Sequence, residues 1–233
     1  MNIFLLPCYN EENSIKDVLE KIKKKFPSSK IIVVDDGSTD RTFQISKDTI
    51  NNLNIDGIIL RHRKNMGLGK ALSTGINYVI KNFEEGNLVI LDADSSHPVE
   101  LTKKMLQELE KGNIDVVIAS RYRTGGKQIN LSFVRNILSR IFSFFFHFLF
   151  PNITDFSSGY RAYSVKFLRE NFKRIELDKG FASSFELLFL LLKKKAKVKE
   201  VPLILDYSKK KSRSKFNFKK VLFSYLRVLS KIL

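Results

Sequence analysis

The fold of this chain is decided by residues 88–98, which read Leu-Val-Ile-Leu-Asp-Ala-Asp-Ser-Ser-His-Pro. The apolar run before Asp92 is typical of a buried strand. Pro98 and Glu100 are typical of the first turn of a helix. Two aspartates, one residue apart, therefore lie where a strand ends and a helix begins. In an open α/β sheet this is the edge at which ligands bind.

The paired carboxylates of Asp92 and Asp94 predict a cation site. Two carboxylates in one dry pocket repel each other unless a cation neutralises them. Mg²⁺ or Mn²⁺ bridging to a diphosphate would do so, which indicates an enzyme that acts on a nucleoside diphosphate compound. The ordinary alternative is an acidic turn in which Asp94 or Ser96 caps the following helix. The rest of the chain has to distinguish the two.

Length and composition limit the class of protein. The 233 residues suffice for one α/β domain with a full core, or for one domain with a small extension. The single cysteine, Cys8, excludes an internal disulfide and a cysteine-rich zinc site, and it fits a reducing compartment. The amino terminus runs directly into an apolar segment, so we expect no cleaved signal peptide. The net charge of +17 predicts an anionic partner: nucleic acid, an acidic membrane surface or a phosphorylated substrate.

Apolar runs alternate with amphipathic segments along the chain. We expect strands at 3–6, 31–34, 57–61, 88–90 and 115–119, a late strand at 198–206, and helices near 15–26, 41–50, 67–82 and 98–111. This alternation predicts an α/β fold with a mostly parallel sheet and helices on both of its faces.

Three of these strands end in polar loops, at 7–13, 35–40 and 92–97. Because the loops follow parallel strands, we expect them to converge on one ligand at the carboxyl edge of the sheet. Tyr9 and Glu11 from the first loop and Asp36 from the second are placed to contact a base or a ribose. The Gly-Leu-Gly-Lys segment at 67–70 lacks the spacing of a Walker phosphate loop, and its glycines suit a tight turn.

Several motifs together identify a family. They are Pro-Cys-Tyr-Asn-Glu at 7–11, Val-Val-Asp-Asp-Gly-Ser-Thr-Asp at 33–40, Asn-Met-Gly-Leu-Gly-Lys-Ala at 65–71 and Asp-Ala-Asp at 92–94. This set resembles the inverting family 2 glycosyltransferases, which have a GT-A fold. Further motifs are similar to those of the polyprenyl-phosphate sugar transferases, of the dolichol-phosphate mannose synthase type: His-Pro at 97–98, Ser-Arg-Tyr at 120–122, 155–163 and 181–187. The resemblance extends from residue 3 to about residue 215.

The resemblance implies a role for each matching residue. The nucleotide sugar would contact Pro7, Tyr9, Glu11, Asp36, Asp92, Ala93, Asp94 and Lys209. The acceptor phosphate would contact Arg121, Arg135, Ser139 and Lys215. Catalytic roles would fall to Asp94, Arg121 and Arg135, and Mg²⁺ or Mn²⁺ would be held by Asp92, Asp94 and Ser96. Three positions depart from the family. Ser96 stands where relatives often have glutamine, and Ser212 replaces a glycine. Lys209 replaces an arginine, which keeps the charge but loses the bidentate fork.

Residues 131–150 form a second unusual region, with 13 apolar residues that include seven phenylalanines. Polar side chains recur every three or four residues as one stripe along the predicted helix. Two of them, Arg135 and Arg140, are charged, and burying them at the centre of a bilayer would be costly. We expect a helix that lies in the membrane interface; the alternative is an amphipathic helix packed on the protein's own core. The predicted organisation is a GT-A domain at 1–207, which includes this helix, and a basic loop with an amphipathic membrane-associating helix at 208–233.

The predicted function is transfer of a hexose from a nucleoside diphosphate sugar to a polyprenyl (dolichyl) monophosphate. Mannose from GDP-mannose is the first choice and glucose from UDP-glucose the second. Basic residues beside an apolar face favour an anionic membrane surface over nucleic acid as the partner. We therefore expect a peripheral, monotopic enzyme on the cytoplasmic face of a membrane. A small membrane-anchoring subunit is a further candidate partner.

Two rival functions stay open. The same fold could transfer sugar to a hydroxyl of a polysaccharide or glycolipid, which requires a carboxylate base, for which Asp155 or Glu186 would serve. An anionic phosphate acceptor needs little or no base, and catalysis would then come from positioning and charge stabilisation. The rival from another class is a non-catalytic basic protein that binds membranes or nucleic acid.

Overall fold

The structure, a computed structural model, describes residues 1–130, 140, 143, 146, 147, 150–178, 180, 182–209, 223–225, 227, 228 and 230, and of Lys209 only the backbone. The predicted site residues Arg135, Ser139 and Lys215 and the side chain of Lys209 lie outside the described part of the chain, as does most of 131–150 and of 208–233.

Strands and helices alternate through the first half of the chain. They are β1 (Asn2–Cys8), α1 (Ile15–Lys25), β2 (Lys30–Asp35), α2 (Thr42–Asn52), β3 (Gly57–Arg61), α3 (Leu68–Asn82), β4 (Asn87–Ile90), α4 (Leu101–Glu110) and β5 (Val116–Ser120). The second half contains β6 (Lys127–Ile129), β7 (Arg161–Ser164), α6 (Val165–Asn171), α7 (Ser183–Lys193), β8 (Val198–Pro202), β9 (Ile204–Asp206) and a 3₁₀ turn, η1 (Tyr207–Lys209).

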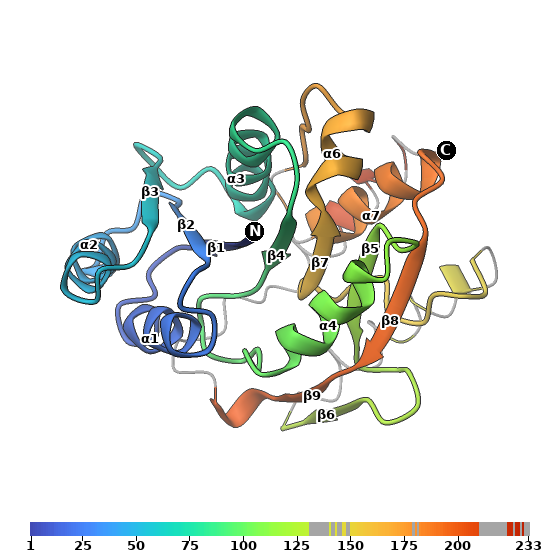
Figure 1. The fold of residues 1–233 in the computed structure, drawn as a ribbon, viewed down its shortest axis with the longest axis horizontal. Coiled ribbons are helices and arrows are strands. Elements are labelled where there is room, and N and C mark those ends of the chain that lie inside the picture. Colours follow the sequence, from blue (N-terminus) through green and yellow to red (C-terminus); the bar gives the residue numbers. More distant parts are fainter. Residues whose placement is uncertain are drawn as a thin grey trace.

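The centre of the molecule is a seven-stranded sheet in the order β3-β2-β1-β4-β7-β5-β8 (Figure 1). β7 runs antiparallel to both of its neighbours, and the other pairings are parallel. β6 and β9 form a separate parallel pair. The mostly parallel sheet flanked by helices is as predicted. Its parallel strands end at one edge, where the three polar loops emerge.

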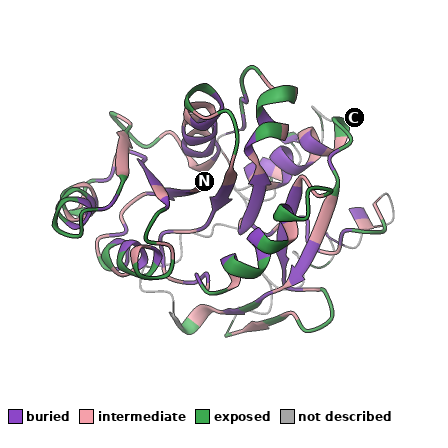
Figure 2. Cartoon of the chain, in the orientation of Figure 1, coloured by how far each residue is buried: buried purple, intermediate pink, exposed green. Residues whose placement is uncertain are grey.

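Helices cover both faces of the sheet, because successive side chains of each strand point to opposite sides. On β1, Ile3 and Leu5 join the apolar cluster under α3, α6 and α7. Phe4 and Leu6 join the cluster under α1 and α4. The strands are therefore apolar on both faces, as buried parallel strands are. Figure 2 shows the central strands buried and the outer faces of α1 and α2 exposed.

The structure corrects three sequence expectations. The late strand expected at 198–206 is two strands, since Leu203 leaves the main sheet after Pro202 and β9 pairs with β6 instead. The fourth helix begins at Leu101 rather than Pro98. The central antiparallel strand β7, and with it α6 and α7, had not been expected. Its four residues, Arg-Ala-Tyr-Ser, carry too little periodicity to indicate a strand.

The described parts of the two outer segments contact the domain. Phe146, which is helical and buried, places its ring 4.7 Å from that of Phe185 and 5.6 Å from that of Phe156. Near the carboxyl end, Tyr225 lies 6.0 Å from Phe185, and Val228 is fully buried. Phe146 thus packs on the protein's own core, the alternative stated for the 131–150 segment, and Tyr225 and Val228 also contact the domain. Among the described helices none is long and apolar enough to span a bilayer.

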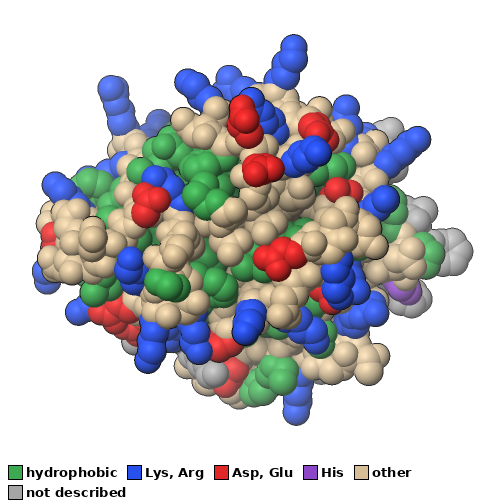
Figure 3. Space-filling view, viewed as in Figure 1, with side chains coloured by type: hydrophobic (Ala, Val, Ile, Leu, Met, Phe, Trp, Pro, Cys, Tyr) green, Lys and Arg blue, Asp and Glu red, His purple; other side chains and the backbone are tan. Residues whose placement is uncertain are grey.

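Positive charge is widely distributed over one face of the molecule (Figure 3). In the face that Figure 3 presents, Lys and Arg side chains surround the molecule instead of gathering in one patch. On the face shown in Figure 3 no single basic patch stands out, so specific anion contacts there have to come from individual residues.

Candidate active site

The Asp92–His97 turn follows β4 at the carboxyl edge of the sheet. The side chain of Asp92 is 47% exposed, whereas Asp94 is buried. Oδ1 of Asp94 accepts the backbone N–H of Ser96 at 3.0 Å, and Ser95 between them has a φ of 66°. This left-handed residue reverses the chain and holds both carboxylates within one tight turn.

Mg²⁺ or Mn²⁺ fits this pair of residues. No group of three His, Cys, Asp or Glu side chains that could hold a metal occurs among the described residues. Mg²⁺ is usually bound by one or two carboxylates together with substrate phosphates, and carboxylate oxygens also suit Mn²⁺. Asp92 and Asp94 supply such a set, with the exposed carboxylate open to a ligand. Ser96 contributes its N–H to Asp94, and its assignment as a metal ligand stays a prediction.

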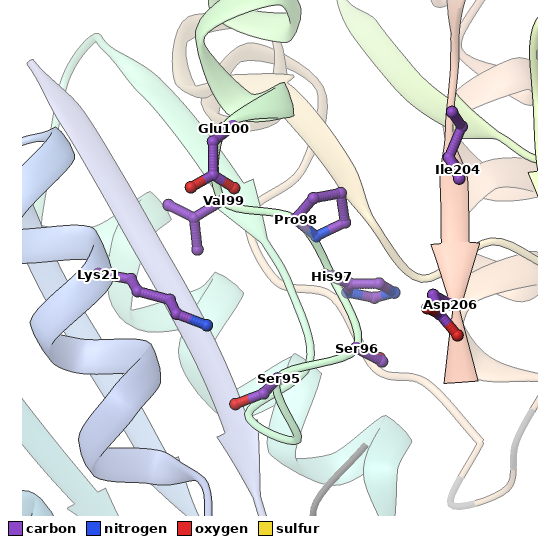
Figure 4. Close-up of a pocket in the computed structure, with 9 residues that line it drawn as sticks. All are labelled: Lys21, Ser95, Ser96, His97, Pro98, Val99, Glu100, Ile204 and Asp206. Carbon is purple, nitrogen blue, oxygen red and sulfur yellow. The ribbon is translucent and has the colours of Figure 1, made fainter. Parts of the chain in front are cut away.

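A small cavity borders the Asp92–His97 turn. Residues 95–100 line it together with Lys21 of α1 and with Ile204 and Asp206 of β9 (Figure 4). Its volume is about 70 Å³, whereas pockets for small-molecule ligands typically measure roughly 300–1,000 Å³. This cavity is too small for a nucleotide sugar. It does show that the segment leading to Lys209 passes beside the Asp turn.

Asp36 is buried and holds the loop before α3. Its Oδ1 is 2.7 Å from Nδ1 of His62 and accepts the N–H of Met66 at 2.9 Å, while Oδ2 accepts the N–H of Gly67 at 2.8 Å. A carboxylate at this place stabilises the positive end of the helix that starts at Leu68. The expectation of a direct contact between Asp36 and a base or ribose remains a prediction, since both of its oxygens already have partners here.

The first two polar loops are bonded to each other. The N–H of Asn10 donates to Oγ of Ser38 at 3.0 Å, and Oδ1 of Asn10 accepts the N–H of Thr39 at 2.9 Å. Glu11 is buried, with its N–H bonded to Oγ1 of Thr42 at 2.7 Å. The loops that carry Tyr9, Glu11 and Asp36 thus form one connected wall beside the Asp turn, as the shared sheet edge predicts.

Arg121 makes a buried bidentate ion pair with Asp155. Nε of Arg121 lies 2.7 Å from Oδ2 and one terminal nitrogen lies 2.7 Å from Oδ1, and the Arg121 backbone N–H donates to Oδ2 at 3.0 Å. Burial disfavours both charges, but the charge and hydrogen bonds of the partner outweigh it. As a result the pKa of Asp155 is lowered and that of Arg121 is raised. Both groups stay charged at neutral pH.

Neither carboxylate considered as a general base is readily available. Asp155 is fully buried, and its lowered pKa makes it a weak proton acceptor. Glu186 is buried and accepts the N–H of Asp178 at 2.6 Å. Their contacts are those of groups that hold neighbouring segments in place.

Glu200 supports this pair and was missed by the sequence reasoning. From β8 its carboxylate accepts the N–H groups of Thr154 and Asp155, both at 2.9 Å, and the hydroxyl of Thr154 at 2.7 Å. It is buried. The available signal was weak, since β8 reads Val-Lys-Glu-Val-Pro and Glu200 is one of its two charged residues. His62 was also missed; it stands directly after β3, at the same edge as the other loops.

Gly159 separates Asp92 from the start of α7. A Cβ atom at Gly159 would lie 3.9 Å from Oδ1 of Asp92 and 3.6 Å from Oγ of Ser184. Buried Arg161 fixes this arrangement, since its guanidinium donates to the carbonyl oxygens of Ser184 and, at 2.8 Å, of Phe156. The space beside the exposed carboxylate is therefore bounded by a glycine and a serine.

The first turn of α3 packs against the segment that leads into α7. A Cβ at Gly69 would lie 1.7 Å from the carbonyl oxygen of Asp178 and 3.0 Å from Cβ of Ser183. Two helix amino termini thus meet near the Asp turn. Asp36 already faces the amino terminus of α3, so it is the backbone N–H groups and dipole at the start of α7 that favour further negative charge, such as that of a diphosphate.

With this geometry the chain can be compared with known proteins. Its sequence matches the model of the glycosyl transferase family 2 over residues 3–172, well over half of the chain. The chain belongs to the family 2 glycosyltransferases. The expected enzyme class, a glycosyltransferase, is thereby confirmed.

Relatives within this family share most of the chain. The polyprenol monophosphomannose synthase of Mycolicibacterium smegmatis is 31% identical over 207 residues, which cover 86% of this chain and 76% of that protein. The dolichol-phosphate mannosyltransferase of Pyrococcus furiosus is 29% identical over 239 residues, which cover 98% of this chain but 62% of that protein. The resemblance to polyprenyl-phosphate sugar transferases is confirmed.

A solved structure confirms the GT-A type of fold. The glucosyl-3-phosphoglycerate synthase of Mycobacterium tuberculosis, in complex with Mn²⁺, UDP-glucose and phosphoglyceric acid, aligns with a TM-score of 0.71. The alignment covers 100% of this chain and 78% of that chain, at 18% identity. At this identity the likeness concerns the fold of the family 2 domain alone.

Proposed function

We propose that this glycosyltransferase moves mannose from GDP-mannose to a polyprenyl monophosphate. The ion pair that Asp155 makes is the observation on which the choice of a phosphate acceptor rests. A hydroxyl acceptor requires a base. Asp155, however, is held in an ion pair with Arg121, and the Glu186 carboxylate accepts the backbone N–H of Asp178. A phosphate acceptor is already anionic and needs little or no base. The named activities of the two mannosyltransferase relatives support both the sugar and the lipid phosphate.

The chain's own residues would bind and orient the two anions. Asp92 and Asp94 would hold Mg²⁺ or Mn²⁺, which when bound supplies positive charge to the departing diphosphate. Arg121 stands at the same sheet edge, where Asp155 holds its guanidinium in place. Holding acceptor and donor in line despite their mutual repulsion is the main contribution expected of the protein. Attack in line would invert the anomeric centre.

We place the reaction at a membrane surface because the proposed acceptor is a lipid. The net charge of +17 supports binding to anionic lipids. We retain as further proposals the cytoplasmic face, the small membrane-anchoring subunit, and roles for Arg135, Ser139, Lys209 and Lys215 in phosphate binding. UDP-glucose is the second candidate donor.

A transfer assay with parallel donors tests the proposal. GDP-mannose and UDP-glucose are offered separately with a polyprenyl phosphate or with a glycolipid hydroxyl acceptor, with Mg²⁺, Mn²⁺ or a chelator. We expect mannosyl polyprenyl phosphate to form from GDP-mannose, and only when the metal is present. Asp94→Asn should lose this activity, and Asp48→Asn, which changes an exposed carboxylate on α2, should retain it.

Each alternative result overturns a defined part of the proposal. Product from UDP-glucose alone replaces the donor. Product on the hydroxyl acceptor alone replaces the acceptor and reopens Asp155 and Glu186 as bases. Undiminished activity with chelator or in Asp94→Asn removes the metal role.

A further inference from the structure

His97 faces both the backbone and the side chain of Asp92. The N–H of Asp92 donates to Nδ1 of His97 at 2.9 Å. Nε2 of the same ring lies 3.8 Å from Oδ2 of Asp92, longer than a hydrogen bond but within range of an electrostatic interaction. Because Nδ1 accepts, the neutral ring carries its hydrogen on Nε2, the nitrogen nearer to the carboxylate.

The imidazole ring is itself held firmly. His97 is buried and stacks on Tyr160, with 4.8 Å between the ring centroids and 17° between the ring planes. The hydroxyl of Tyr160 lies 2.6 Å from Oγ1 of Thr102 and donates to the carbonyl oxygen of Pro98 at 3.0 Å. Burial raises the pKa of Tyr160, so the hydroxyl retains its proton and remains a donor. The orientation of the ring is therefore determined from several sides.

Tyr160, on which His97 stacks, is bonded to the strand that leads to Arg121. The carbonyl oxygen of Tyr160 accepts the N–H of Ala119 at 3.0 Å, two residues before Arg121. Through the stacked rings, the Asp turn after β4 is connected to the end of β5. A change at His97 would therefore alter the placement of Asp92 relative to that strand end.

We propose that His97 is a positioning residue that fixes Asp92 for the divalent cation and the donor diphosphate. This role rests on the proposed function, because it assigns the metal and the diphosphate to Asp92. An exposed carboxylate samples several rotamers, and a group that restrains it beforehand lowers the cost of ordering it on binding. A purely packing role for the ring makes a different prediction: the shape of the side chain would matter and its nitrogens would not.

Three substitutions at His97 separate these roles. His97→Phe keeps a planar ring for the stack on Tyr160 but removes both nitrogens. His97→Asn places an amide oxygen near the position of Nδ1, where it can accept the N–H of Asp92, and His97→Gln places its amide near the position of Nε2. His147→Phe is the matched control, because Nδ1 of His147 is 2.8 Å from the carbonyl oxygen of Ile153, outside the Asp turn.

The first measurement is Mn²⁺ affinity in the presence of GDP or UDP, followed by electron paramagnetic resonance of the free ion. Loss of a residue that orients a metal ligand typically lowers metal affinity roughly 10–100-fold. We expect a loss of this size in His97→Phe, a smaller loss in His97→Asn than in His97→Gln, and no change in His147→Phe. In the transfer assay, the KM for the lipid phosphate should stay unchanged in His97→Asn.

The second measurement needs no metal. Hydrogen exchange at the backbone amide of Asp92 reports directly on its bond to Nδ1. We expect slow exchange in the unsubstituted protein and in His97→Asn, and faster exchange in His97→Phe and His97→Gln. Melting temperatures show whether each variant is folded.

Wild-type Mn²⁺ affinity together with a protected Asp92 amide in His97→Phe would overturn the positioning role. If that variant does not fold, equal affinity and equal exchange in His97→Asn and His97→Gln would overturn it instead. Failure of the unsubstituted protein to bind Mn²⁺ with either nucleotide contradicts the proposed function, and the exchange of the Asp92 amide still decides whether His97 fixes that residue.

Discussion

Replacing Asp155 by Asn removes the negative charge that is paired with the buried guanidinium of Arg121. Asp155 is fully buried and Arg121 is 9% exposed, so the remaining charge has little access to water. Breaking a buried pair by removing one partner costs about 3–5 kcal/mol. Since each kcal/mol shifts the melting temperature of a chain this size by roughly 2–4 °C, Asp155→Asn should melt roughly 6–20 °C lower.

A double-mutant cycle measures this coupling. Arg121→Met removes the positive charge and retains much of the side-chain volume. Because replacing both partners of a buried pair by uncharged groups is often neutral or stabilising, the double variant should melt higher than Asp155→Asn alone. Calorimetry of the four proteins provides the test. The reasoning fails if Asp155→Asn melts within about 2 °C of the unsubstituted protein, or if the double variant melts as low as Asp155→Asn.

The same pair has a pH signature. Burial raises the pKa of Asp155, but the charge and hydrogen bonds of Arg121 outweigh it, and the folded pKa is lowered. The stabilisation is therefore fully present above the unfolded pKa of roughly 4 and is lost as the pH falls through the lowered folded pKa. In urea titrations below pH 4, the unsubstituted protein should lose more unfolding free energy than Asp155→Asn. Equal losses would contradict the assignment.

Three further substitutions test the surrounding site. Asp94→Asn should nearly abolish transfer and leave the melting temperature almost unchanged; full activity would exclude the metal role. Gly159→Ala places a methyl group 3.9 Å from Oδ1 of Asp92, an ordinary contact, so we expect a normal fold in calorimetry but a several-fold higher KM for the nucleotide sugar. In Gly69→Ala the new Cβ would lie 1.7 Å from the carbonyl oxygen of Asp178, so the backbone has to shift. We expect this to lower the free energy of unfolding in urea by about 1–3 kcal/mol. An unchanged urea midpoint would show that α3 can shift without cost.

The sequence predicted those parts of the fold that depend on local pattern. The apolar runs became β1 to β5, because buried parallel strands are apolar on both faces. β7 was missed since its first residue, Arg161, is a fully buried charge. That charge is accommodated by carbonyl oxygens of Phe156 and Ser184, and Ser184 is 23 residues away in the chain. No local pattern contains such a contact.

The candidate site was predictable where its residues lie close together in the chain. Asp92 and Asp94 are recognisable from their spacing after a strand. The pairing of Arg121 with Asp155 spans 34 residues, and the support from Glu200 spans a further 45, so only the folded chain brings these groups together. The inward direction of the Asp36 carboxylate likewise depends on its contacts with the loop before α3.

The antiparallel strand β7 divides the sheet into two blocks. On one side, β3, β2, β1 and β4 all come from the first 90 residues, and on the other lie β5 and β8. The proposed donor residues of the loops and the Asp turn are thus encoded by one uninterrupted segment, whereas Arg121 and Asp155 belong to the other block. If the proposed roles hold, a chimaera that exchanges this segment between family members would exchange these donor contacts and leave Arg121, Asp155 and Lys209 in place, provided that the ladder between β4 and β7 is kept in register. The strand that breaks the parallel order is in this sense a natural boundary for recombination.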